Sequence, residues 1–258
     1  MGHVSVIGCG NMGSALVRGL SRTGTHTITA CDVDQQVLDE IEVHCETTTT
    51  DLATAAESPI VFVVVKPDLT AAIVEDLDLS SDQTLISIAA GVPTTVLEAR
   101  TDADVVRLMP NLAAATGDMA AAVSAETLTD EVADLLEDVG VFVEIDETEM
   151  HVSTAVNGSG PAFVYYFIGA MIQAGVDGGL SRDDATVLAA QTFKGAAETV
   201  LQSDASIDDL IDDVCSPKGT TIEGMGVLRE STADEALMAA VAAAERRSEE
   251  LARGVEHE

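Results

Sequence analysis

Residues 4–13, VSVIGCGNMG, decide the fold of this chain. The first four residues have the pattern of a buried strand, and Gly8–Gly13 then fit the pattern G-x-G-x-x-G. An apolar segment follows in which Leu16, Val17 and Leu20 lie at helical spacing. Strand, glycine turn and helix in this order are the context in which the pattern marks a dinucleotide-binding turn.

Each glycine of this turn has a physical reason to be glycine. Gly8 permits the tight turn, Gly10 has no side chain that would block a pyrophosphate, and Gly13 lets the helix pack close to the strand. Free N–H groups at the start of the helix then face the phosphates. The residues expected to form this cofactor-binding turn are Gly8, Cys9, Gly10, Asn11, Met12 and Gly13.

A second predicted strand, Thr27–Cys31, ends at Asp32, which has about the spacing expected for the acid that binds the cofactor ribose. This spacing favours nucleotide binding over the alternative, a plain βαβ unit with a glycine turn. The carboxylate of Asp32 can accept from the 2′-OH of NADH and would repel the 2′-phosphate of NADPH. No Lys or Arg lies between Thr23 and Asp51 to bind that phosphate. We expect both cofactors to work, with NADH preferred and the preference shrinking as salt screens the repulsion.

The chain has 258 residues, enough for about two domains. Its formal net charge is −33, from 45 acidic and 12 basic residues, so it should repel nucleic acids and anionic membranes. The acids are spread along the chain among apolar residues, as on solvated helix faces. An alternative interpretation is adaptation to high intracellular salt, because self-repulsion of this size needs screening.

The longest strongly apolar run, residues 60–65, is far too short to cross a bilayer, and the N-terminus lacks the pattern of a secretory signal. The four cysteines form no CxxC pair, which favours reduced structural thiols, and no metal site is expected. We therefore expect a cytoplasmic protein.

Strand-like and helix-like segments alternate from His3 to about Glu144. This alternation, with continuous apolar strands, predicts a Rossmann-type, doubly wound parallel sheet covered on both faces. The expected strands are 4–7, 27–31, 60–65, 84–88, 105–108 and 141–144. The expected helices between them are 12–21, 35–41, 69–77 and 131–137.

From about Met150 onward only helices are expected, so the boundary falls near 147–153. We expect a dinucleotide-binding domain at 1–150 and an all-helical domain at 151–258. The helices expected there are 161–174, 182–201, 207–214, 220–229 and 234–253.

Two short loops follow strands of the first domain, Val65-Lys66-Pro67 and Ala89-Ala90-Gly91. In an open parallel sheet, ligands bind beyond the carboxyl ends of strands. Taken alone, these residues are better explained as ordinary loop residues than as ligand contacts. Residues 107–111 stand at the end of the next expected strand. There Arg107 is interpreted as an ion-pair partner at the edge of the core and Asn111 as a turn residue.

Two helix starts stand out in the second half. Residues 157–161, NGSGP, place Pro161 at the first helical position. Residues 216–221, SPKGTT, open another helix, where Thr220 and Glu223 fit a capping box. The functional alternative is an anion site at this helix N-terminus, which the placement of Lys218 strengthens.

Together these blocks resemble the pyrroline-5-carboxylate reductase family, in the family's order and over nearly the whole chain. The matching stretches are IGCGNMG (7–13), VKP (65–67), AAG (89–91), RLMPN (107–111), NGSGPAF (157–163) and SPKGTTIEGM (216–225). Departures from the family pattern are Asp68, Leu112-Ala113 and Lys218, where Gln, Thr-Pro and Gly are usual.

The resemblance implies reduction of 1-pyrroline-5-carboxylate to L-proline, the last step of proline biosynthesis, with NADPH or NADH. It also implies that the helical domain forms an intertwined homodimer, which can assemble further. Beyond the glycine turn and Asp32, which is expected from its spacing, the cofactor contacts that the resemblance implies are Val65, Lys66, Pro67, Ala89, Ala90 and Gly91. Many members of the family use NADPH, which opposes the preference for NADH expected from Asp32.

For the substrate, the resemblance implies that the carboxylate binds around Gly219 and Thr220, aided by Ser216 and Lys218. Thr221 would be the catalytic residue, its hydroxyl bonding the ring nitrogen. Two acids, Glu147 and Asp204, align with acids near the family's substrate site.

Two alternatives stay open. A β-hydroxyacid dehydrogenase shares the glycine turn, but it needs a lysine in the helix that follows residues 157–161, and none is present. A non-catalytic NAD(P)-binding regulator would keep the turn but would not need the SPKGTT helix start.

Overall fold

The computed structural model describes residues 2–255, with the side chains of residues 254 and 255 left out. The chain divides into two compact units. The first unit holds the residues up to Ser159 and those from Val241 on, and the second is Gly160–Ala240. The domain boundary expected at residue 150 falls inside the first unit, at α7 (Met150–Ser153).

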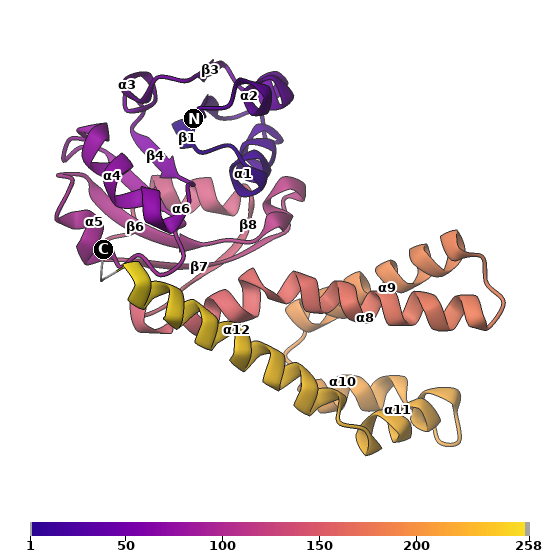
Figure 1. Ribbon diagram of the computed structural model, residues 1–258. Helices are drawn as coiled ribbons and strands as arrows, with labels where there is room; N and C mark the ends of the chain where they lie inside the picture. The colour runs from indigo at the N-terminus through magenta and orange to yellow at the C-terminus, as the bar shows by residue number, and fades with distance from the viewer. Residues whose placement is uncertain (1, 256–258) are drawn as a thin grey trace. The chain divides into compact units, whose positions relative to one another are not determined.

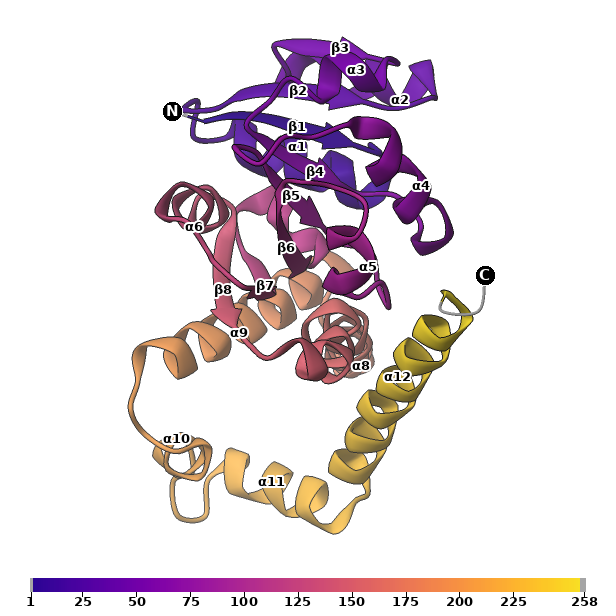
Figure 2. The same ribbon diagram turned by 90° about the vertical axis from the view of Figure 1, so that its left-hand side faces the viewer.

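The first unit is built on one eight-stranded sheet, with strand order β3-β2-β1-β4-β5-β6-β7-β8 (Figure 2). Its strands are β1 (His3–Ile7), β2 (Thr27–Cys31), β3 (Thr47–Thr49), β4 (Ile60–Val63), β5 (Thr84–Ser87), β6 (Asp104–Met109), β7 (Met119–Ala125) and β8 (Gly140–Glu144). All six expected strands are present. The chain order reverses between β1 and β4, which is the switch point where open α/β sheets bind ligands.

The expectation of a parallel sheet is confirmed for every neighbouring pair except β6 and β7, which are antiparallel. The sequence analysis missed β7, because its sequence MAAAVSA is dominated by alanine, which is depleted in strands. Between these strands lies only the short 3₁₀ helix η2 (Leu112–Thr116). A parallel pair needs a crossover of a dozen residues or more, so this short connection returns the chain antiparallel. The three-residue β3 was also missed.

Helices cover both faces of the sheet (Figure 1). One face packs against α1 (Asn11–Ser21), α2 (Gln35–Ile41) and α6 (Asp130–Glu137). The other packs against α3 (Leu52–Ala55), α4 (Pro67–Leu77) and α5 (Thr94–Glu98). Each face of the sheet has its own apolar core, and successive residues of a strand pack into opposite cores. In β1, Val4 and Val6 pack into the core under α1, α2 and α6, and Ile7 packs into the core under α3, α4 and α5. Both faces are therefore buried, as the apolar strands predicted.

A run of short helices follows β8 in the first unit. It comprises η3 (Glu147–Glu149), α7 and the π-helical turn η4 (Thr154–Gly158). The C-terminal half of α12 (Ala233–Val255) belongs to this unit as well. In the part of the chain that the structure describes, no helix is both long and apolar enough to span a membrane.

The second unit consists of helices, as expected. They are α8 (Gly160–Asp177), α9 (Arg182–Gln202), α10 (Ile207–Val214), α11 (Thr220–Glu230) and the first turns of α12. Only Ala185 and Ala189 are buried among the described residues of α8 to α11. Large apolar side chains stay exposed, among them Tyr166 at 76% and Leu201 at 75%. Taken by itself, this unit therefore leaves much of its apolar surface in water.

Candidate functional site

The glycine turn has the geometry that its sequence predicted. Gly8 has φ +90°, and a Cβ atom there would lie 2.5 Å from the carbonyl oxygen of Val64. A Cβ at Gly13 would lie 1.9 Å from the carbonyl oxygen of Gly8, so α1 can pack this close only with glycine. A Cβ at Gly10 would meet no atom within 4 Å. The space beside Gly10 is therefore open for a group that approaches the backbone.

The start of α1 offers unpaired amides to that space. Its N-cap is Gly10, which supplies no side-chain cap, and its first turn carries no acidic residue. The Ser14 hydroxyl donates to the Cys9 carbonyl at 2.6 Å and fixes the turn. A helix start with free N–H groups and no nearby acid of its own favours a phosphate.

Asp32 lies directly beside this turn. Its Oδ2 accepts the Cys9 N–H at 2.6 Å, and its Oδ1 accepts the Asp34 N–H at 2.9 Å. Both oxygens are therefore fixed in direction, and each keeps a free lone pair that can accept a further hydrogen bond. Sequence spacing placed Asp32 near the turn, but the bond to the Cys9 amide is visible only in the structure.

The loop after β4 contacts the glycine turn. The Val64 N–H donates to the Ile7 carbonyl at 2.7 Å, and Val65 lies against Gly8. Lys66 is the N-cap of α4, and Pro67 occupies the first turn, so the loop is shorter and the helix begins earlier than expected. The structure thus brings the IGCGNMG and VKP residues together at the carboxyl ends of β1 and β4.

The loop after β5 packs against α12. Gly91 has φ +78°, and a Cβ there would lie 2.8 Å from both Cα and N of Ala252. Ala89 and Gly91 are buried, and Ala90 is partly buried. The close approach that a glycine permits here is made by another helix of the chain, which the sequence analysis did not foresee.

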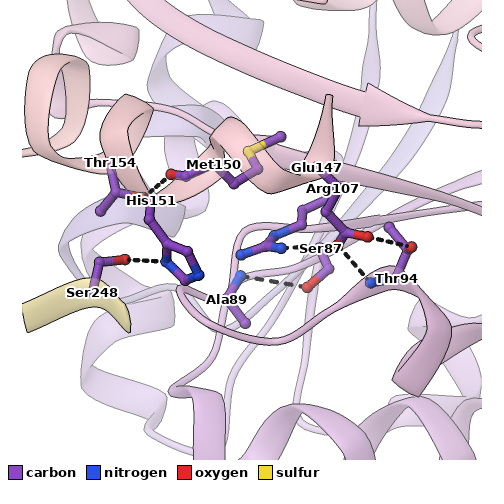
Figure 3. Close-up of polar contacts among 9 residues, drawn as sticks. All are labelled: Ser87, Ala89, Thr94, Arg107, Glu147, Met150, His151, Thr154 and Ser248. Carbon is purple, nitrogen blue, oxygen red and sulfur yellow. Dashed lines mark hydrogen bonds and ion pairs between the residues drawn. The ribbon is translucent and has the colours of Figure 1, made fainter. Parts of the chain in front are cut away.

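Arg107 forms the expected ion pair, and its partner is Glu147 (Figure 3). The guanidinium Nη1 donates to Glu147 Oε1 at 2.8 Å, and Arg107 is only 3% exposed. Thr94 donates its N–H to the same carboxylate at 2.8 Å and its hydroxyl at 2.9 Å. Burial acts to raise the pKa of Glu147, but the bonds from Thr94 and Arg107 outweigh it and hold this pKa below its ordinary 4.5.

Two asparagines join two of the motif blocks. Asn111 caps η2, as expected of a turn residue, by accepting the Ala113 N–H at 3.2 Å. Its Nδ2 donates to the Asn157 carbonyl at 3.2 Å, and Asn157 Nδ2 donates to the Met109 carbonyl at 2.7 Å. The sequence analysis named both residues but gave no sign that they bond to each other.

The SPKGTT stretch lies in the second unit. The predicted capping box is wrong: the N-cap of α11 is Gly219, and Thr220 is already the first helical residue. The helix begins at Thr220, as expected, and a tight loop precedes it, in which the Gly219 N–H donates to the Ser216 carbonyl at 2.9 Å. Gly219 has no side chain to cap the helix, so the amides of its first turn stay available.

The other residues expected to bind substrate have different surroundings. Thr221 lines an apolar cavity of about 490 Å³ with side chains of α9, α10 and α11, including Ile211, Val214 and Met225. Ser216, Lys218 and Thr220 are exposed. Asp204 is exposed in the connection between α9 and α10, and Glu147 belongs to the first unit.

The switch-point loops, the open Gly10 and the acid beside it define a Rossmann-type dinucleotide-binding protein. Comparisons with known proteins narrow this class. Residues 147–251 match the family model for pyrroline-5-carboxylate reductase dimerisation. Residues 3–91 match the model for NADP oxidoreductase, coenzyme F420-dependent.

Whole-chain relatives agree with these matches. The pyrroline-5-carboxylate reductase of Methanosarcina acetivorans is 36% identical, and the alignment covers 96% of this chain and 97% of the relative. The Arabidopsis thaliana enzyme is 35% identical, with 96% and 95% covered. The chain therefore belongs to the pyrroline-5-carboxylate reductase family.

Solved structures show the same relationship. A Coxiella burnetii pyrroline-5-carboxylate reductase superimposes with a TM-score of 0.86 at 29% identity, covering 97% of this chain and 98% of that one. The Plasmodium falciparum pyrroline carboxylate reductase, solved with NADP bound, has a TM-score of 0.85 at 28% identity, with 97% and 98% covered. Family membership favours the reductase over both alternatives that the sequence left open.

Proposed function

We propose that this protein reduces 1-pyrroline-5-carboxylate to L-proline with NAD(P)H, the last step of proline biosynthesis. The observation that carries the proposal is the match to pyrroline-5-carboxylate reductases over nearly the whole chain. The open space beside Gly10 supports a dinucleotide, because a pyrophosphate needs this approach to the backbone. The cofactor residues would be those of the glycine turn with Asp32, the VKP loop and the AAG loop.

The reaction needs little acid–base chemistry from the protein. A protonated imine is already electrophilic, and the reduced nicotinamide supplies the hydride. The amides around Gly219 and Thr220, with Ser216 and Lys218, would bind the substrate carboxylate. The Thr221 hydroxyl would bond the ring nitrogen and orient the imine carbon. Alignment of this kind can contribute about 7–11 kcal/mol to lowering a barrier.

Steady-state oxidation of NAD(P)H with pyrroline-5-carboxylate, measured in molar salt, tests the proposal. Turnover of a 3-hydroxyacid but not of the imine would contradict it. Thr221→Ala should lower kcat by roughly 10- to 100-fold, since a hydrogen bond to a charged group contributes about 1.5–3 kcal/mol. Thr221→Ser, which keeps the hydroxyl, is the matched control. Equal kcat/KM in Thr221→Ala and the unmodified protein would remove Thr221 from the mechanism.

We also propose that NADH is preferred over NADPH. Support comes from the two fixed oxygens of Asp32 and from the absence of Lys and Arg between residues 23 and 51. The test is kcat/KM for each cofactor across a salt series, for the unmodified protein and Asp32→Ser. The preference for NADH should shrink as salt rises and in the variant. A strong NADPH preference that Asp32→Ser leaves unchanged would show that Asp32 does not face the ribose.

For its organisation, we propose a cofactor domain at 1–150 and a substrate-binding, dimerising domain at 151–258, with at least a homodimer in solution. The match to a dimerisation model at 147–251 supports this, as do the exposed apolar side chains of α8 to α11. A monomeric mass by light scattering in high salt, together with full activity, would contradict it.

We further propose a cytoplasmic location at high salt, with all four thiols reduced. The thiols are unpaired in the structure, and the charge of −33 calls for screening. We expect the protein to bind its small-molecule substrate, a cyclic imine carboxylate, and to bind neither nucleic acids nor membranes.

A further inference from the structure

The C-terminal half of α12 makes specific contacts with the cofactor side of the first unit. Ser248 is only 4% exposed, on a helix whose other described residues are half-buried or exposed. Its hydroxyl lies 3.0 Å from His151 Nδ1 of α7 (Figure 3). One turn further along the same face, Ala252 lies against Gly91. The helix is thus held at two points, one of which is the loop after β5.

The same loop is held at its other end. Thr94, at the start of α5, donates two hydrogen bonds to Glu147, whose carboxylate also pairs with the buried Arg107. Glu147 and His151 are one helical turn apart, in η3 and α7. The short segment from Glu147 to His151 therefore bonds directly to one end of the loop after β5, and it also holds α12, the helix that covers the middle of that loop.

Gly91 shows how closely this packing is fitted. A Cβ at this position would lie 2.8 Å from backbone atoms of Ala252, which no side-chain rotation can relieve. The left-handed φ of +78° further restricts the position to glycine. The backbone of the loop at Gly91 fits only because Ala252 of α12 carries a small side chain. In turn, α12 blocks movement of the loop away from the sheet.

We propose that Ser248 and Ala252 are positioning residues for the NAD(P)H site, because they hold α12 against the loop of residues 88–94. The inference rests on the proposed function, in which this loop, at the carboxyl end of β5, contacts the cofactor. Neither residue touches the cofactor; each acts through the loop. Loosening α12 should therefore weaken cofactor binding and leave the chemical step nearly unchanged once the site is filled.

Two variants test this in the full-length protein. Ser248→Ala removes the bond to His151, and Ala252→Val brings methyl groups into the space next to Gly91. Arg253→Gln is the matched control, since it breaks only the exposed ion pair with Glu249 in the same turns. Hydrogen exchange of a peptide spanning 88–95 and the Kd of NAD(P)H, from cofactor fluorescence, are measured for each.

In both variants hydrogen exchange of residues 88–95 should become faster and the Kd of NAD(P)H should rise. For Ser248→Ala we expect the Kd to rise about threefold to tenfold. In both variants kcat at saturating cofactor should stay within about twofold of the unmodified protein. Arg253→Gln should change none of these. Folded variants with unchanged exchange at 88–95 would overturn the proposal, as would faster exchange with unchanged Kd. If the unmodified protein binds no NAD(P)H, the proposed function fails, and with it the role of these residues in cofactor binding; the exchange data then report separately on whether α12 orders the loop.

Discussion

Lys218 holds a backbone conformation that residues other than glycine rarely adopt, with φ 61°. The left-handed region costs a residue with a Cβ about 1–2 kcal/mol. Glycine is the usual residue at this place in the family that the sequence resembles. Strain of this kind is often kept where a side chain serves a site, and here the side chain is a cation beside the helix start at Thr220.

Replacing Lys218 with glycine should therefore stabilise the protein. We expect Lys218→Gly to raise the free energy of unfolding by about 1 kcal/mol and to raise the KM for the imine. Lys218→Ala, which loses the charge but keeps the Cβ, is the control: its KM should rise without a gain in stability. Denaturant unfolding in high salt and steady-state kinetics check this, and equal stabilisation by both variants would contradict the backbone explanation.

Glu147 gives the protein a stability that depends on pH. Its pKa is lowered in the folded state, so its contribution is present above the ordinary pKa of 4.5 and is lost as the pH falls through the lower, folded-state pKa. Glu147→Gln should cost about 2 kcal/mol at neutral pH, because the hydrogen bonds from Thr94 and Arg107 lose their charged partner. The difference from the unmodified protein should shrink as the pH drops below 4.5.

Denaturant midpoints between neutral and acid pH, at constant salt, measure this difference. Glu126→Gln, an exposed acid in the loop before α6, is the control and should change little at any pH. A Glu147→Gln deficit that stays constant down to acid pH would mean that the charge of Glu147 is not what stabilises the pair.

At the scale of elements, the packing of α1 on η2 depends on Gly19. A Cβ there would lie 2.2 Å from the carbonyl oxygen of Ala114, so the helix and the 3₁₀ turn would have to separate. Gly19→Ala should lower the free energy of unfolding by about 1–3 kcal/mol, despite the better helix propensity of alanine. Arg18→Ala, one residue earlier and exposed, should change it by about 0.5 kcal/mol or less. Thermal or denaturant unfolding checks both, and a stabilised Gly19→Ala would show that η2 can move.

The elements also show where sequence reasoning succeeded. The bounds of β2, α2 and α10 agree with those expected, because each has a clear apolar pattern with a defined start. Asp34 and Ser206 cap the two helices, since each side chain accepts an N–H of its first turn. β7 escaped prediction because its alanine-rich sequence lacks a strand pattern. Its antiparallel direction depends on the short connection that precedes it and not on the strand's own residues.

At the scale of the whole molecule, the charge of −33 predicts that stability depends on salt. The Debye screening length falls from about 10 Å at 0.1 M salt to about 3 Å at 1 M, so repulsion between surface carboxylates falls steeply over this range. Tm should rise with potassium chloride, by about 2–4 °C for each kcal/mol gained. A nonionic osmolyte serves as the control and should give a much smaller rise. A protein that stays folded and fully active with almost no added salt would contradict this.

The sequence by itself determined the parts of this protein that depend on local chemistry. The glycine turn, the acid after β2, the alternation of strands and helices and the helical second half all follow from spacing and apolar periodicity within short windows. The family could also be recognised from the sequence, because its motif blocks are short and local. Each of these features can be identified without knowing where the fold places it.

Only the tertiary structure decided which distant residues meet. It paired Arg107 with Glu147, Asn111 with Asn157, and Ser248 with His151, and it placed Ala252 against Gly91. Such contacts join residues far apart in the chain, and their geometry is set by how whole elements pack. A single sequence carries no local pattern for them, because each partner has the same local signature whether or not the other is near.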